Sequence, residues 1–164
     1  MPRTRLDEID RQILSDLQEN GRITNVELAQ RAGISAPPCL RRVRALETDG
    51  YIRGYHADLD ASKLGFEVTF FALIGLATQA QDRLRAFEEL VRDWPSVREC
   101  HMVRGGGDFL LKLYARNTAH ENELTQALTS APDVVRVTTF PVIRTDKALP
   151  GVPIENAPAV GEEA

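Results

Sequence analysis

The pattern of apolar residues before residue 56 differs from the pattern after it, and this difference constrains the fold more than any other feature. Before that point apolar residues recur every three or four positions, which is typical of amphipathic helices. After it, runs rich in branched and aromatic residues alternate with two stretches of helical spacing. We therefore predict an α+β chain with a helical domain over residues 1–55 and a mixed domain over residues 67–145.

The first 55 residues predict three helices whose ends carry capping residues. Apolar residues at helical spacing over residues 6–17 form one stripe, and Asp7 precedes most of it as an N-cap. Thr24 and Glu27 have the spacing of a capping box, so we expect a second helix to begin at Thr24. This helix is expected to end at Gly33, because glycine favours the conformation that terminates helices.

A glycine turn over residues 33–35 leads into a third helix, predicted over residues 36–48. We expect Ile34 to fill the gap between the two helices and Ser35 to cap the third one. Residues 51–55 alternate like a short strand. The buried side of the third helix is predicted to contain Leu40, Val43 and Leu46.

Two helices joined by a short glycine turn, with a basic second helix, are typical of a helix-turn-helix DNA-binding unit. Arginine binds a phosphate or a guanine edge with two donors, and the amino end of a helix attracts phosphates. A helical domain that only packs is the alternative interpretation. The residues predicted to contact double-stranded DNA are Thr24, Asn25, Ser35, Ala36, Pro37, Arg41, Arg42, Arg44 and Arg53.

The net charge of −4 does not exclude DNA, because the charge is unevenly distributed. Residues 1–55 hold nine arginines and eight acidic residues, whereas residues 56–164 carry a net charge of −5. The chain is therefore expected to contact DNA narrowly, through one helix per subunit, and to need two or more subunits for useful affinity.

The second half of the chain predicts the order strand, helix, strand, strand, helix, strand. This order is typical of a ferredoxin-like βαββαβ domain, in which one antiparallel sheet carries both helices on one face. We expect a linker over residues 56–66 and a tail over residues 146–164 that is partly disordered. The strands are predicted over residues 67–77, 97–104, 108–116 and 134–144, and the helices contain residues 84–94 and 124–128.

The predicted sheet has large apolar residues on both faces. Phe70 and Ile74 alternate with Phe71 and Leu73 in the first strand, and the third strand shows the same pattern. One layer of helices covers only one face, so we expect the other face to pair with a second copy of the chain.

The chain has no pattern of an enzyme or of a metal site. Its two cysteines and three histidines match no metal-ligand spacing, and no nucleophile or phosphate-loop motif occurs. We expect no catalytic residues, no metal and no cofactor. The longest apolar run is too short to cross a membrane and no export signal is present, so we expect a cytoplasmic protein that does not bind membranes.

Three runs of the sequence resemble the Lrp/AsnC family of transcription regulators, also called feast/famine regulators. They are LDEIDRQILSDLQENGRITNVELAQRAGIS (6–35), PCLRRVRALETDGYIRGYHADLD (38–60) and ECHMVRGGGDFLLKL (99–113). The resemblance implies an amino-terminal winged helix-turn-helix domain and a carboxy-terminal effector-sensing domain. It also implies dimers, often assembled into octamers or larger forms, with a small effector, usually an amino acid, bound between subunits.

The resemblance places the effector site near the glycine turn. The family's glycine–acid signature falls on Gly105, Gly107 and Asp108, and the turn here has three glycines where relatives usually have bulkier residues. Backbone N–H groups in such a turn can hold a carboxylate, and Asp108 can pair with an ammonium. The alternative is a tight hairpin that Asp108 merely caps. The predicted effector residues are Met102, Arg104, Gly105, Gly107, Asp108, Thr118, Phe140, Pro141 and Val142.

Siroheme decarboxylases, which are enzymes, are similar in architecture to this family and are the main rival. They need histidines or arginines that line a cleft large enough for a tetrapyrrole. In this chain the basic residues cluster on the third predicted helix instead. The sequence therefore favours a DNA-binding regulator whose DNA binding or assembly responds to an effector.

Overall fold

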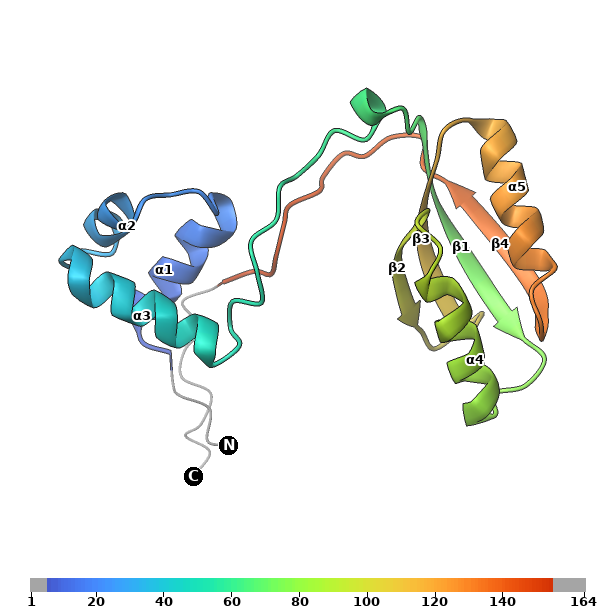
Figure 1. Ribbon diagram of the computed structural model, residues 1–164, viewed down its shortest axis with the longest axis horizontal. Coiled ribbons are helices and arrows are strands. Elements are labelled where there is room, and N and C mark those ends of the chain that lie inside the picture. Colours follow the sequence, from blue (N-terminus) through green and yellow to red (C-terminus); the bar gives the residue numbers. More distant parts are fainter. Residues whose placement is uncertain (1–5, 155–164) are drawn as a thin grey trace. The chain divides into compact units, whose positions relative to one another are not determined.

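The computed structural model describes residues 6–154, which form two compact units (Figure 1). Among the described residues, one unit contains residues 6–58 and 147–154, and the other runs from Leu59 to Asp146. Residues 155–164, which form the end of the predicted tail, lie outside the described residues, as do residues 1–5 at the start of the predicted helical domain.

The first unit contains helices α1 (Glu8–Glu19), α2 (Asn25–Arg31) and α3 (Ala36–Thr48). Both predicted caps are confirmed. The Asp7 side chain accepts a hydrogen bond from the Asp10 N–H at 2.8 Å, and Thr24 accepts one from the Glu27 N–H at 3.2 Å. Each cap satisfies a backbone donor that has no partner inside its helix, so both helices begin where the sequence predicts.

The turn between α2 and α3 depends on Gly33, whose φ of 68° lies in the left-handed region that favours glycine. The next residue, Ile34, packs into the core of the unit, as predicted. The fully or largely buried residues of this core are Ile13, Leu28, Ala29, Cys39 and Leu46.

Two predictions about α3 are wrong. Ser35 makes no side-chain cap hydrogen bond, although it occupies the N-cap position. Leu40 is 40% exposed, and Cys39 is fully buried in its place. The face of α3 that meets the core therefore follows Cys39, Val43 and Leu46, which is equally compatible with helical spacing.

The short strand predicted over residues 51–55 does not form. The N–H groups of Tyr51 and Ile52 both donate to the Leu46 carbonyl, which folds this segment back onto the end of α3. Ile52 packs against the core, and the Tyr55 hydroxyl donates to Glu47 at 3.0 Å. Because these contacts are local, the alternating pattern reflects packing against α3 rather than pairing in a sheet.

The second unit is a four-stranded antiparallel sheet with two helices on one face, which confirms the predicted βαββαβ fold (Figure 1). The strands lie in the order β2-β3-β1-β4, so β1 is central and pairs with both β3 and β4. The elements are β1 (Val68–Leu76), α4 (Gln81–Arg92), β2 (Val97–Met102), β3 (Phe109–Ala115), α5 (Thr118–Thr129) and β4 (Val134–Pro141). A single 3₁₀ turn, Ser62–Leu64, precedes the sheet.

The two faces of the sheet have the predicted alternation. Phe70, Ala72 and Ile74 of β1 are fully buried against the helices. Phe71 and Leu73 lie on the opposite face and are only half-buried. We call this opposite side the open face, and its other apolar residues are Leu110 and Tyr114 of β3 and Phe140 of β4.

Several elements are shorter than the sequence predicts. α4 ends at Arg92, and Trp94 then packs against the core from a turn in which its N–H donates to the Val91 carbonyl. β4 ends at Pro141, and the Val142 N–H that follows still donates to the Thr69 carbonyl at 2.8 Å. No helix among the described residues is long and apolar enough to cross a membrane.

The first part of the predicted tail packs against α1 in the first unit. The Gln18 side-chain amide donates to the Val152 carbonyl at 2.8 Å, and the Val152 N–H donates back to the same amide at 2.9 Å. The expectation of a loose tail therefore does not extend to residues around Val152.

Candidate functional site

The exposed side of α3 carries three of the residues predicted to contact DNA. Pro37, Arg41 and Arg44 are spaced by four and three positions, so they lie on one face of the helix. All three side chains are exposed. Within residues 6–154, neither arginine has an ion pair with an acidic side chain, so both guanidinium groups are available to an anion in solution.

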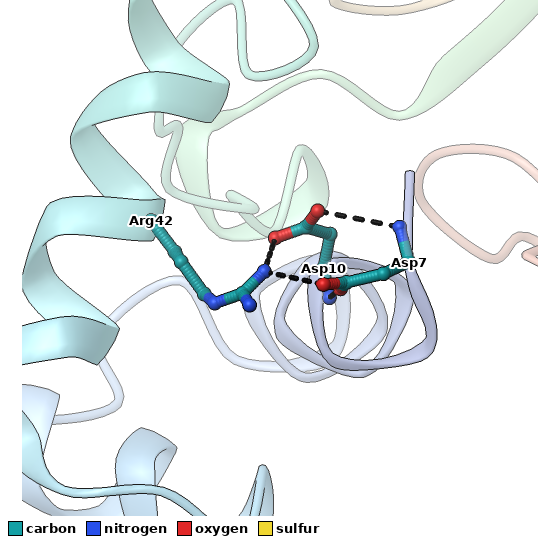
Figure 2. A network of polar contacts seen from close by, with 3 residues as sticks. All are labelled: Asp7, Asp10 and Arg42. Atoms are coloured by element: carbon teal, nitrogen blue, oxygen red, sulfur yellow. Dashed lines mark hydrogen bonds and ion pairs between the residues drawn. The ribbon is translucent and has the colours of Figure 1, made fainter. Parts of the chain in front are cut away.

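Arg42 has a different environment, because its side chain turns toward the start of α1 (Figure 2). One guanidinium nitrogen, Nη1, lies 2.8 Å from the Asp7 carboxylate and 2.7 Å from the Asp10 carboxylate. Asp7 and Asp10 are also the two members of the α1 capping box. Arg42 therefore connects α3 to the cap of α1 by two charge-assisted hydrogen bonds.

The pKa shifts around Arg42 have a clear direction. The hydrogen bond from the Asp10 N–H, together with Arg42, lowers the pKa of the Asp7 carboxyl. The two carboxylates raise the pKa of Arg42 in turn. Since the carboxyl pKa is lower in the folded state, the Asp7 contribution to stability is present above pH about 4 and is lost as the pH falls.

The remaining predicted DNA contacts lie mostly at the amino ends of α2 and α3. The Asn25 side chain donates to the Ala36 carbonyl at 2.8 Å, which holds these two helix ends together. Thr24 and Ser35 occupy the N-cap positions of the two helices. Arg53 is exposed and lies in the segment that follows α3, without the predicted strand.

Around the glycine turn the second unit has two adjoining hollows of about 470 and 520 Å³. Both are lined by Gln79, Gly105, Gly107 and Asp108. The larger one is also lined by Met102 and Arg104. Five of the nine predicted effector residues therefore lie around one concave region at the end of β1.

The Asp108 side chain is 9% exposed, and the hydrogen bonds of its carboxylate stabilise this concave region. One carboxylate oxygen accepts from the Leu76 N–H at 2.7 Å, and the other accepts from the Gln79 amide at 2.8 Å. Both donors are neutral, and the described residues supply no cationic partner. Asp108 therefore caps the end of β1. Because an ionised carboxylate can accept about four hydrogen bonds, it can also accept hydrogen bonds from a cation.

Gly105 and Gly107 are needed in the turn for different structural reasons. Gly105 has a φ of 127°, which side chains rarely tolerate. A Cβ at Gly107 would lie 2.8 Å from both the Ile74 carbonyl oxygen and the Leu73 side chain, so only glycine fits there. Within the described residues the N–H groups of this turn donate no hydrogen bond, which leaves them available to an anion.

Arg136 lines the smaller hollow and was missed by sequence reasoning. Its guanidinium donates to the Gly106 carbonyl and lies against Gly75. Arg136 belongs to β4, 28 positions after Asp108, and comes opposite Gly75 only through pairing of β4 with β1. An exposed arginine on an edge strand carries no local signal of such a role.

The other four predicted effector residues lie at the opposite end of the sheet. Phe140 and Pro141 pair with Phe71 and Phe70, and the Val142 N–H donates to the Thr69 carbonyl. Thr118 opens α5, just after the end of β3. Phe140 is four residues from Arg136 along β4, or about 13 Å. A single chain thus does not bring all nine residues together.

The described part of the chain contains no group of three or more His, Cys, Asp or Glu side chains that could hold a metal ion. Cys39 is buried and Cys100 is exposed, and both thiols are free. Burial raises the pKa of the Cys39 thiol, and partial desolvation raises the pKa of the Cys100 thiol, so both environments oppose formation of the reactive thiolate.

Two family models match the chain, one on each unit. The model described as winged helix-turn-helix DNA-binding covers residues 6–53, and the model described as Lrp/AsnC ligand binding domain covers residues 69–152. The second match covers half of the chain and contains the sheet, the glycine turn and the residues around both hollows.

Relatives with curated names are regulatory proteins. The chain is 51% identical over 143 residues to the leucine-responsive regulatory protein of Rhizobium meliloti strain 1021, covering 87% of this chain and 92% of the relative. It is 36% identical over 151 residues to the transcriptional regulator AzlB of Bacillus subtilis strain 168, covering 92% and 96%.

A solved structure supports the same assignment. The crystal structure of a transcriptional regulator from Neisseria meningitidis in complex with L-Met matches with a TM-score of 0.87 and 33% identity. The match covers 92% of this chain and 97% of that one.

The turn geometry generates a prediction about two adjacent glycines. We expect Gly107→Ala to destabilise the second unit, by about 1–3 kcal/mol, because its Cβ would overlap the β1 backbone. Gly106→Ala is the matched control, since its Cβ would only touch Leu73 at 3.7 Å. Urea unfolding monitored by Trp94 fluorescence measures both. Equal stability of the two variants would contradict this account of the turn.

Proposed function

Because the chain belongs to the Lrp/AsnC family of transcriptional regulators, we propose that it binds operator DNA through α3 and responds to an aliphatic amino acid. The DNA-binding part rests on Arg41 and Arg44, two exposed arginines on one face of α3 that have no acidic partner among the described residues. The observation that carries the effector part is the hollow at the glycine turn, where free backbone N–H groups lie beside a buried carboxylate. A regulator that acts on DNA belongs in the cytoplasm.

The two exposed arginines and Arg42 have different roles in this proposal. Arg41 and Arg44 contact DNA directly, and Pro37, Ala36, Ser35, Thr24, Asn25 and Arg53 complete the interface. Arg42 is a positioning residue, because its Nη1 group binds Asp7 and Asp10 and turns the side chain toward α1. Its single positive charge also offsets half of the negative charge of these two carboxylates, which would otherwise repel phosphates more strongly.

Arg41→Met and Arg42→Met form a matched pair that separates these roles. Both variants lose one positive charge from neighbouring positions of α3, and both should weaken binding to the protein's own upstream DNA. Arg41→Met should reduce the slope of log affinity against log salt by about 1, because a phosphate contact is lost. Arg42→Met should leave this slope unchanged, because it alters the position of α3 but removes no phosphate contact.

Gel-shift titrations at four salt concentrations measure both slopes. An unchanged slope for Arg41→Met would reject α3 as the contact helix. A reduced slope for Arg42→Met would show that Arg42 leaves its carboxylates and binds DNA, as the sequence alone predicts.

The effector part of the proposal follows from the chemistry of an amino acid. Its carboxylate needs N–H donors or a cation, and its ammonium needs an anion. The glycine turn has free N–H groups, and Asp108 has an anionic charge with only neutral partners. L-leucine and L-methionine are the first candidates, since relatives carry the name leucine-responsive and one is solved with L-Met.

We expect Asp108→Asn to abolish binding of L-leucine and L-methionine while DNA binding persists. The amide keeps the size of the carboxylate and can still accept from the Leu76 N–H, but it loses the charge that attracts an ammonium. Isothermal titration calorimetry measures the affinity, and Asp93→Asn, which changes an exposed acid after α4, is the control. Unchanged affinity in Asp108→Asn would refute a role of the carboxylate in binding.

A dimer is the third part of the proposal, and it rests on the open face of the sheet. Phe71, Leu73, Leu110 and Tyr114 are half-buried there, and Phe140 is 49% exposed. Pairing of two open faces would bury this surface. A second copy, or a larger assembly of dimers such as an octamer, also provides a way for the two separated groups of effector residues to meet.

We expect Thr138→Arg to shift the protein toward monomers at micromolar concentration. Thr138 pairs with Leu73, so it shares the open face, and it is exposed, so the fold should tolerate the change. Gln126→Arg on the exposed side of α5 is the control. Light scattering during size-exclusion chromatography gives the mass, against 18.2 kDa for one chain. A wild-type protein that is strictly monomeric would reject the dimer.

A further inference from the structure

We propose that Arg136 binds the carboxylate of the effector and so selects ligands with a free α-carboxyl group. This inference rests on the proposed amino-acid response and adds the group that recognises one end of the ligand. Neither the sequence pattern nor the family resemblance assigns a role to Arg136.

The position of the guanidinium is set by backbone contacts. It donates to the Gly106 carbonyl, and it lies against Gly75, where the lack of a side chain leaves room for it. Arginine has five N–H donors, and one of them is used here. Arg136 lines the same hollow as Gly105 and Gly107, so an anion bound in that hollow would meet donors of the guanidinium and of the turn.

Arg136 and Asp108 line the same hollow of about 470 Å³ and carry opposite charges, yet they form no ion pair with each other. Asp108 is held by Leu76 and Gln79, and Arg136 is held by Gly106. Two opposite charges kept apart by separate partners are complementary to a zwitterion, whose carboxylate and ammonium are also separate. The planar guanidinium favours a carboxylate because it can donate two parallel hydrogen bonds.

A merely structural role for Arg136 is the competing explanation, in which its bond to Gly106 only fastens the turn to β4. The two roles differ in what they do to ligand selectivity. If the hydrogen bond to Gly106 only stabilises the turn, its loss lowers the affinity for all ligands alike. Loss of a carboxylate partner lowers the affinity only for ligands that have a carboxylate.

The experiment compares amino acids with their amides on the full-length protein. The probes are L-leucine, L-methionine, L-leucinamide and L-methioninamide, and binding is measured by calorimetry and by the rise in melting temperature. In the wild type we expect the acid to bind about tenfold or more tightly than its amide, as a charged hydrogen bond implies. In Arg136→Met this ratio should fall to about threefold or less.

Two further variants make the result specific. Arg85→Met removes the same charge from an exposed position on α4 and should keep the wild-type ratio. Arg136→Lys keeps the charge but loses the planar donor pair, so its ratio should lie between those of the wild type and Arg136→Met.

The outcomes distinguish this inference from the proposed function beneath it. If neither L-leucine nor L-methionine binds the wild type, the proposed effector response and the role of Arg136 are both overturned. If L-leucine or L-methionine binds the wild type and Arg136→Met keeps the same preference for acid over amide, only the role of Arg136 is overturned. A ratio that falls in Arg136→Met, falls less in Arg136→Lys and stays unchanged in Arg85→Met supports the carboxylate contact.

Discussion

The sheet of the second unit has two apolar faces and one layer of helices, and this constraint shapes the rest of that unit. α4 and α5 cover the face that holds Phe70 and Ile74, where burial is complete. The open face carries the glycine turn and Arg136 at one end, and the rest of it is available to a ligand or a second copy of the chain. The candidate effector site therefore lies where the chain's own packing ends, which is where a ligand or a second copy can still add contacts.

Backbone proximity gives the effector region its shape. Gly107 lets the turn approach β1 within the reach of the Ile74 carbonyl, and Asp108 then caps the end of that strand. Gly75 provides the space in which the Arg136 guanidinium lies. Gly75 and Gly107, which lack side chains, and the capping residue Asp108 thus bring the charges of Asp108 in the turn and of Arg136 in β4 around one hollow.

In the first unit, neighbouring arginines of one helix have different environments because of the geometry of that helix. Successive residues point about 100° apart, so Arg41 faces outward when Arg42 faces α1. Arg42 meets Asp7 and Asp10, whose spacing was set by their role as a capping box. A cluster of arginines in the sequence consequently combines two exposed side chains, Arg41 and Arg44, with one structural contact at Arg42.

The sequence by itself determined the order of elements, the helix caps at Asp7 and Thr24, the alternation of apolar residues along β1 and the two-domain organisation, because these depend on local spacing and on residues that favour helix ends. It misassigned the cap at Ser35, the burial of Leu40 and the strand after α3, where the alternatives differ by one helical position or by a local fold-back. Only the tertiary structure decided the partners of Arg42, the two donors on Asp108 and the place of Arg136 opposite Gly75. Those contacts join residues about 30 positions or more apart, and no local pattern encodes which of several similar side chains will meet across a sheet or between two helices.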